Sequence, residues 1–144
     1  MRLFTIGFTK KSAEEFFELL RGAGVRRVVD IRLNNVSQLA GFTKRDDLAY
    51  FLDRVAGIGY THVPMLAPTQ DLIDSYRKQG MPFADFAREF KKVLKKRKVE
   101  SLPEAQLTDG DCLLCSEEDA SVCHRSQVAA YLAPHYKDLT VTDL

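Results

Sequence analysis

The sequence lacks the features that mark exported, membrane-spanning and strongly charged proteins. No apolar run approaches the ~18 residues of a membrane span, and the first residues lack the apolar core and cleavage site of a signal peptide. The formal net charge is only +1, so no global field draws the chain to nucleic acid or to a membrane. We therefore expect a cytoplasmic protein, in which nucleic-acid binding would need a local patch.

Cysteine is scarce and glycine-rich phosphate motifs are absent. The three cysteines are an odd number in a chain without an export signal, which favours reduced thiols over a disulfide framework. No fingerprint of the dinucleotide or P-loop type occurs, so neither NAD nor ATP is indicated and we expect no cofactor. No repeat, low-complexity segment or interdomain linker is present, and 144 residues match the size of one domain.

Apolar runs typical of strands alternate with amphipathic segments typical of helices. Strands are predicted at Arg2–Gly7, Val25–Ile31, Tyr60–Val63, Asp111–Cys115 and Asp138–Val141. Helices are predicted after the capping pattern Ser12 to Glu15, after Thr43, over Asp71–Gln79, after Pro82 and over Ser121–Leu132. This alternation predicts a single α/β domain over residues 1–144, with three layers and a mostly parallel sheet of about five short strands flanked by helices.

Polar side chains gather where the predicted strands end. Asp30 and Arg32 are two residues apart and project to the same side of an extended strand. Gly7 and the segment Cys115–Glu117 fall at the carboxyl ends of two other strands. Ligands of parallel sheets usually bind beyond these ends, so this edge is the predicted site.

The stretch from Asp111 to Leu132 leads from a strand to a helix that starts with Cys123, His124 and Arg125. On such a helix, His124 and Arg125 share the face of the apolar residues that must contact the sheet. The functional interpretation is an anion site for phosphate or carboxylate, formed by the helix start, Arg125, Arg32 and, when protonated, His124. In the structural interpretation, Arg125 pairs with Asp30 or Glu117 and His124 binds a loop carbonyl.

Metal and thiol chemistry are two further interpretations of the same stretch. Cys112, Cys115, Cys123 and His124 resemble a four-ligand zinc set, but residues 112 and 115 point to opposite faces of a strand, and we predict no metal site. A thiol in the first turn of a helix beside an imidazole can have a lowered pKa. A helical Cys123 would project about 140° away from Val128, which makes Cys115 the better candidate thiol.

A basic run from Arg88 to Lys98 and the histidine of the third strand each have two interpretations. The basic run would suit nucleic acid, or it is a solvated helix face with cations at the C-terminal end, where the helix dipole favours them. His62 is more typical of a structural histidine than of a catalytic one.

Several short motifs occur together over essentially the whole chain. They are TIGFT at Thr5–Thr9, VVDIR at Val28–Arg32, Ser37, YTH at Tyr60–His62, LLCSE at Leu113–Glu117 and CHR at Cys123–Arg125. In this order and at these spacings the sequence resembles the domain of unknown function 488 family. The resemblance implies a compact cytoplasmic α/β domain with the motifs at one sheet edge, and it supplies no reaction. It supports as a shared constellation Asp30, Arg32, Ser37, Cys115, Glu117, Cys123, His124 and Arg125.

The sequence departs from the pattern of this family at four positions. Many members have His, Pro and a basic residue where Phe8, Asn35 and Gln38 stand, and Asp143 replaces an expected His. Two of these departures remove an imidazole and a cation from the loops at the predicted site. A positively charged pocket is therefore less strongly indicated here than in those relatives.

Three functional hypotheses follow, and the sequence does not decide whether the protein is an enzyme or which oligomer it forms. In the first, Arg32 and Arg125 bind a phosphate-bearing or other anionic ligand, a nucleotide or nucleic acid included. The further binding residues are Ser37 and Thr9, and the catalytic candidates are His124 or Glu117 as acid or base with Asp30 orienting them. The second is a non-catalytic module that binds nucleic acid or protein, in which the same charged cluster is a structural ion-pair network. The third is thiol redox chemistry or sulfur transfer through Cys115 or Cys123.

Overall fold

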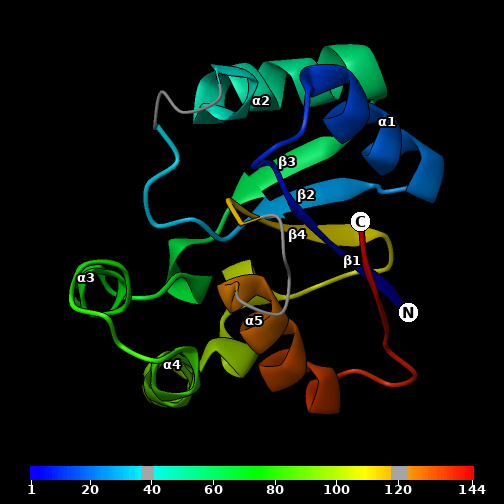
Figure 1. The fold of residues 1–144 in the computed structure, drawn as a ribbon. Coiled ribbons are helices and arrows are strands. Elements are labelled where there is room, and N and C mark those ends of the chain that lie inside the picture. Colours follow the sequence, from blue (N-terminus) through cyan, green and yellow to red (C-terminus); the bar gives the residue numbers. More distant parts are fainter. Residues whose placement is uncertain (37–40, 118–122) are drawn as a thin grey trace.

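The computed structural model describes residues 1–36, 41–117 and 123–144, which contain one sheet of five parallel strands (Figure 1). The strand order is β3-β2-β4-β1-β5. The strands are β1 (Arg2–Gly7), β2 (Arg27–Asp30), β3 (Gly59–His62), β4 (Asp111–Cys115) and β5 (Thr140–Asp143). The helices are α1 (Ala13–Ala23), α2 (Arg45–Phe51, continued by a π-helical turn, Leu52–Ala56), α3 (Gln70–Lys78), α4 (Phe83–Arg97) and α5 (His124–Leu132).

The helices form two layers around the sheet, which confirms the predicted three-layer α/β architecture. Figure 1 shows α1 and α2 on one face and α3, α4 and α5 on the other. Alternate residues of each strand therefore enter different cores. In β4, for example, Cys112 and Leu114 pack towards α1 and α2, whereas Leu113 and Cys115 pack towards α4 and α5. The predicted separation of Cys112 from Cys115 is confirmed.

The register of the strands brings their carboxyl ends to one edge. Gly7 of β1 is paired with Cys115 of β4, and Asp30 of β2 lies between Leu114 of β4 and His62 of β3. Because all neighbouring strands run the same way, the loops that follow them leave the sheet on the same side. The motif residues at these strand ends are therefore neighbours in space.

Helix α1 shows that local sequence signals set this architecture. The Ser12 hydroxyl accepts a hydrogen bond from the Glu15 N–H at 3.1 Å, as the capping pattern predicts, and Gly24 ends the helix with a φ of 76°. Strands β1 and β4 have the predicted bounds. No helix among the described residues is long and apolar enough to cross a membrane.

Two predicted helix starts are wrong. Helix α5 begins at His124, because Cys123 has an extended backbone with a φ of −120° and a ψ of 147°, and residues 121 and 122 lie outside the described ranges. Helix α2 begins at Arg45, because Thr43 belongs to a preceding 3-10 turn and Lys44 takes the cap position. The first of these shifts changes the chemistry of the site, since it reorients Cys123.

Candidate functional site

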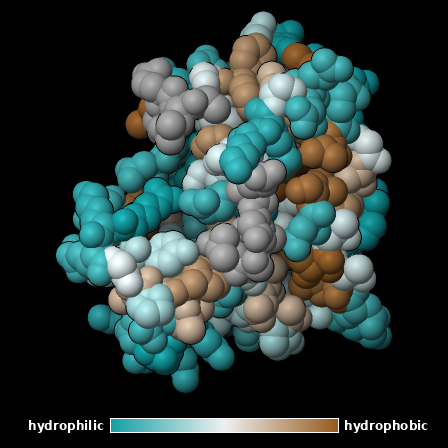
Figure 2. Space-filling view, viewed as in Figure 1, coloured by the Kyte–Doolittle hydropathy of each residue, from teal (hydrophilic) through white to brown (hydrophobic). Residues whose placement is uncertain are grey.

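A cavity of about 350 Å³ opens at the carboxyl edge of the sheet, between the loops after β1, β2 and β4, helix α3 and the start of α5. Its volume is at the lower end of the range for small-molecule sites. The charged side chains that line it are Arg32, Asp74, Arg77, Lys78 and Glu117, and Cys123 and His124 also line it. Hydrophilic side chains cover α3 beside it (Figure 2).

Asp30 and Arg32 form a buried ion pair at one wall of this cavity. The Arg32 Nε and Nη2 atoms each donate to an Asp30 carboxylate oxygen at 2.9 Å, and Nη2 also donates to the Thr43 carbonyl at 2.7 Å. The exposed fractions of the two side chains are 0% for Asp30 and 6% for Arg32. The predicted common side of these two residues is confirmed. Two-point contact holds the guanidinium rigidly, and its Cζ atom lies 5.4 Å from the centroid of the Phe8 ring.

Two further groups complete the hydrogen bonding of Asp30. The Tyr60 hydroxyl donates to Asp30 Oδ2 at 2.6 Å, and the Asn35 side-chain amide approaches the same oxygen at 3.4 Å. Burial, and then the negative charge of Asp30, raise the pKa of the Tyr60 hydroxyl, so it stays a donor. Asp30 is therefore the centre of a closed polar network, the kind of arrangement that the structural interpretation expects.

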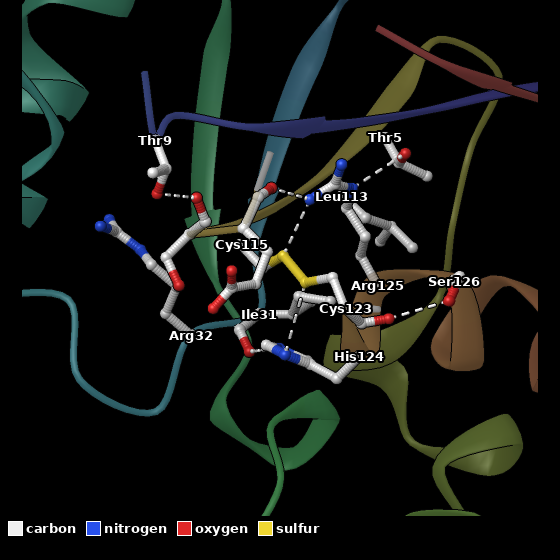
Figure 3. Close-up of a disulfide and its surroundings, with 12 residues drawn as sticks. Thr5, Thr9, Ile31, Arg32, Leu113, Cys115, Cys123, His124, Arg125 and Ser126 are labelled. Atoms are coloured by element: carbon white, nitrogen blue, oxygen red, sulfur yellow. Dashed lines mark hydrogen bonds between the residues drawn. A yellow bond between two sulfur atoms is a disulfide. The ribbon is translucent and has the colours of Figure 1, made fainter. Parts of the chain in front are cut away.

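His124 binds the backbone carbonyl of Ile31, as the same interpretation predicts. Its Nε2 atom lies 2.8 Å from the Ile31 oxygen (Figure 3), and because a carbonyl only accepts, Nε2 carries the proton. Burial is the main cause that lowers the pKa of His124 to about 4, with the nearby positive charges of Arg77 and Arg125 adding to it. His124 is therefore neutral near pH 7 and adds no positive charge to the cavity, contrary to one prediction.

Arg125 is fully buried and does not line the cavity. Its Nε donates to the Thr5 hydroxyl at 3.2 Å, and its Nη1 donates to Cys115 Sγ at 3.2 Å and to the backbone carbonyl of Glu117 (Figure 3). The Thr5 hydroxyl in turn donates to the Asp143 carboxylate. Arg125 thus faces the sheet, as the helical phase predicts, and fastens the loop after β4 to β1 and α5.

The Glu117 side chain points the other way, to α3. Its carboxylate forms an exposed ion pair with Arg77 at 3.3 Å. Arg125 therefore contacts the backbone carbonyl of Glu117 and not its carboxylate. The predicted partner residue of Arg125 is correct, but the predicted ion pair with its side chain is wrong. On the neighbouring loop, the Thr9 hydroxyl donates to the Ser116 carbonyl at 2.5 Å.

Cys115 and Cys123 are joined by a disulfide, which contradicts the prediction of reduced thiols. The reason lies in the late start of α5. Since Cys123 precedes the helix in an extended conformation, its side chain crosses to the end of β4 and does not follow the helical phase assumed for it. Cys112 is the free cysteine. The Cys123 sulfur also lies 3.9 Å from His124 Nδ1.

Two further residues singled out in the sequence are Ser37 and His62. Ser37 lies outside the described residues. His62 Nε2 binds the Arg32 carbonyl at 2.7 Å, as a structural histidine would.

Arg77 and Lys78, which line the cavity, were missed by sequence reasoning, because their position depends on how the turn after β3 places α3 over the strand ends. Two consecutive cations at the end of a short helix are the only signal that the sequence offers for them.

Comparison with models of protein families shows to which family the chain belongs. The family model described as Domain of unknown function DUF488 matches residues 12–132. The chain belongs to this family. No curated protein and no solved structure matches the chain. The DUF488 match covers all of α1 with its capping pattern, β2 to β4 and α5, so the cavity and its disulfide lie almost entirely within the family domain.

Proposed function

We propose that the cavity at the carboxyl edge binds a small phosphate-bearing or other anionic ligand. The observation that carries the proposal is that Arg77 and Lys78 of α3 line the same cavity as Arg32, which follows β2. Cations from two separate elements, around a concave site of ligand size, are a common basis for phosphate recognition. Arg32 is fixed by Asp30, whereas Arg77 and Lys78 reach the solvent.

The acidic residues of the cavity do not prevent such binding. Arg77 pairs with Glu117 at 3.3 Å and Lys78 with Asp74 at 3.4 Å, and three of the four side chains are more than 40% exposed. Exposed pairs of this kind contribute only about 0–1 kcal/mol. An entering phosphate, which carries more charge than a carboxylate, can therefore replace Glu117 and Asp74 as the partner of the two cations.

The site residues predicted from the sequence then take different roles. Arg32 contacts the ligand, and Asp30 orients Arg32. Arg125 holds the loop that carries Glu117, which makes it a positioning residue. A neutral His124 gives the ligand no charge, and its ring N–H is bound to the Ile31 carbonyl. The catalytic roles of His124, Glu117, Asp30, Cys115 and Cys123, a cytoplasmic location and nucleic-acid binding stay predictions.

The test is the melting temperature of the protein with increasing inorganic phosphate and pyrophosphate at constant ionic strength. Ligand binding to the folded state raises the melting temperature by mass action. We expect a shift in the wild type that is mostly lost in Arg77→Gln/Lys78→Gln. The matched control is Lys91→Gln/Lys92→Gln, which removes two exposed cations of α4 that do not line the cavity. Equal shifts in both double variants would overturn the proposal.

Thiol redox chemistry is a second candidate, and the Cys115–Cys123 disulfide favours it. In the dithiol form, one thiolate would attack a small-molecule disulfide and release one thiol. The other cysteine would then attack the mixed disulfide and release the second thiol. The test is alkylation of the reduced protein at neutral pH. If neither thiol reacts faster than a free cysteine, this candidate fails.

A further inference from the structure

We propose that the dithiol form of the protein binds a thiophilic divalent metal ion, zinc above all, between Cys115, Cys123 and His124. One ligand atom from each of these three residues lies within 4.8 Å of the other two. In the part of the chain that the structure describes, this is the only such group of His, Cys, Asp or Glu side chains. Two thiolates and an imidazole are preferred ligands of zinc.

The orientation of His124 suits a metal ligand. Its Nε2–H donates to the Ile31 carbonyl at 2.8 Å, which leaves the lone pair on Nδ1, the atom that faces Cys123 Sγ at 3.9 Å. A metal-bound histidine usually donates its other ring N–H to a carbonyl or a carboxylate, which fixes the tautomer and the ring plane. The Ile31 carbonyl already provides this second contact.

Arg125 gives the Cys115 sulfur a comparable support. Its Nη1 donates to Cys115 Sγ at 3.2 Å from a fully buried position. A donor directed at the sulfur stabilises the thiolate form that a metal requires. The two thiolates would offset the double charge of the ion, so that the site is neutral apart from the Arg125 guanidinium.

The three protein ligands leave one position of a tetrahedral ion open. Cys123 and His124 both line the cavity, so the open position faces it and water can occupy it. Zinc sites with three protein ligands and an open position are typical of catalytic sites, whereas structural sites have four. This inference does not depend on the proposed anion binding, and its test contains no phosphate.

Metal binding and the disulfide exclude each other. Reduction of Cys115–Cys123 takes two electrons and two protons, which a dithiol reductant supplies as its own two sulfurs form a disulfide. Zinc then displaces one proton from each thiol. Cys112 takes no part, because it packs on the opposite face of β4. The alternation of the strand therefore excludes a four-ligand site with Cys112 and permits the three-ligand site.

The experiment uses untagged protein reduced with dithiothreitol, freed of reductant without oxygen, and titrated with Co²⁺ and with Zn²⁺ against a chromophoric chelator. We expect one equivalent of Co²⁺ with thiolate charge-transfer absorption, displaced by Zn²⁺. Cys115→Ser and Cys123→Ser should weaken Zn²⁺ binding by at least about tenfold, and Cys112→Ser should leave it unchanged. His124→Gln keeps a donor for the Ile31 carbonyl and loses the Nδ1 ligand, so it should also weaken binding.

The disulfide form of the wild type serves as a control that needs no substitution. It should bind neither ion, and reduction should restore binding of one equivalent. The proposal is overturned if reduced wild type binds no more metal than the disulfide form. It is also overturned if folded Cys115→Ser and Cys123→Ser, checked by circular dichroism, bind Zn²⁺ as tightly as Cys112→Ser does.

Discussion

The Tyr60 hydroxyl donates a 2.6 Å hydrogen bond to the carboxylate of Asp30, across the neighbouring strands β3 and β2. The bond belongs to the network in which Asp30 also holds the Arg32 guanidinium. Since the Asp30 carboxylate is fully buried, each of its donors matters for stability. This network fixes the wall of the cavity, while the exposed cations of α3 remain able to change partners.

Tyr60→Phe should lower the free energy of unfolding by about 1–3 kcal/mol, because it removes one donor from a buried carboxylate. Urea denaturation measures the change. Tyr50→Phe is the matched control, since Tyr50 is 60% exposed and should change stability by no more than about 0.5 kcal/mol. Equal effects of the two substitutions would show that the Asp30 contact contributes nothing to stability.

The same contact predicts a dependence of stability on alkaline pH. Burial and the charge of Asp30 raise the pKa of the Tyr60 hydroxyl in the folded protein, whereas an unfolded tyrosine titrates near pH ~10. The stability that this group contributes is therefore complete below about pH 10 and is lost as the pH rises above it. Between about pH 10 and about pH 11, wild type should lose stability more steeply than Tyr60→Phe. Parallel curves would contradict this origin of the slope.

Gly7 is required by a close approach of two backbones. A Cβ added at Gly7 would lie 1.6 Å from the backbone oxygen of Glu117, whereas a Cβ at Gly22 in α1 would meet nothing within 4 Å. Gly7→Ala must displace the loop after β4 and should destabilise the protein by at least about 1–3 kcal/mol. Gly22→Ala should stabilise it by about 0.5–1 kcal/mol. Denaturation of both variants tests the contrast, and a neutral Gly7→Ala would contradict the close approach.

Arg125 should prove essential for stability and not for ligand contact. Arg125→Met removes the donors to Thr5, Cys115 and the Glu117 carbonyl from a fully buried position. We expect a loss of more than about 2 kcal/mol, while a phosphate-induced rise in melting temperature persists in the folded variant. Arg88→Met, which alters an exposed cation of α4, is the control with little change. Loss of the phosphate effect at unchanged stability would instead make Arg125 a ligand contact.

Much of the fold could be predicted from the sequence because the signals are local. The apolar run Asp111–Cys115 and the capping pattern at Ser12 each specify an element without reference to the rest of the chain. The convergence of Asp30, Arg32 and Cys115 at one edge follows from parallel strands alone. The face that Arg125 presents to the sheet follows from helical phase.

The rest depends on contacts between distant segments. The disulfide could not be predicted, because one residue at the start of α5 decides whether Cys123 follows the helical phase or crosses to β4. The partner of Arg125 is a backbone carbonyl, and the sequence carries no signal for such an acceptor. Arg77 and Lys78 reach the cavity through the placement of α3, which the turn after β3 determines.

The most direct measurement of the proposed anion site is a crystal structure of the protein grown with pyrophosphate. The account predicts the anion in the cavity, within hydrogen-bond distance of Arg77 and Lys78, with both cations turned away from Glu117 and Asp74. An empty cavity with both ion pairs closed, or pyrophosphate bound only on the exposed basic face of α4, would contradict it.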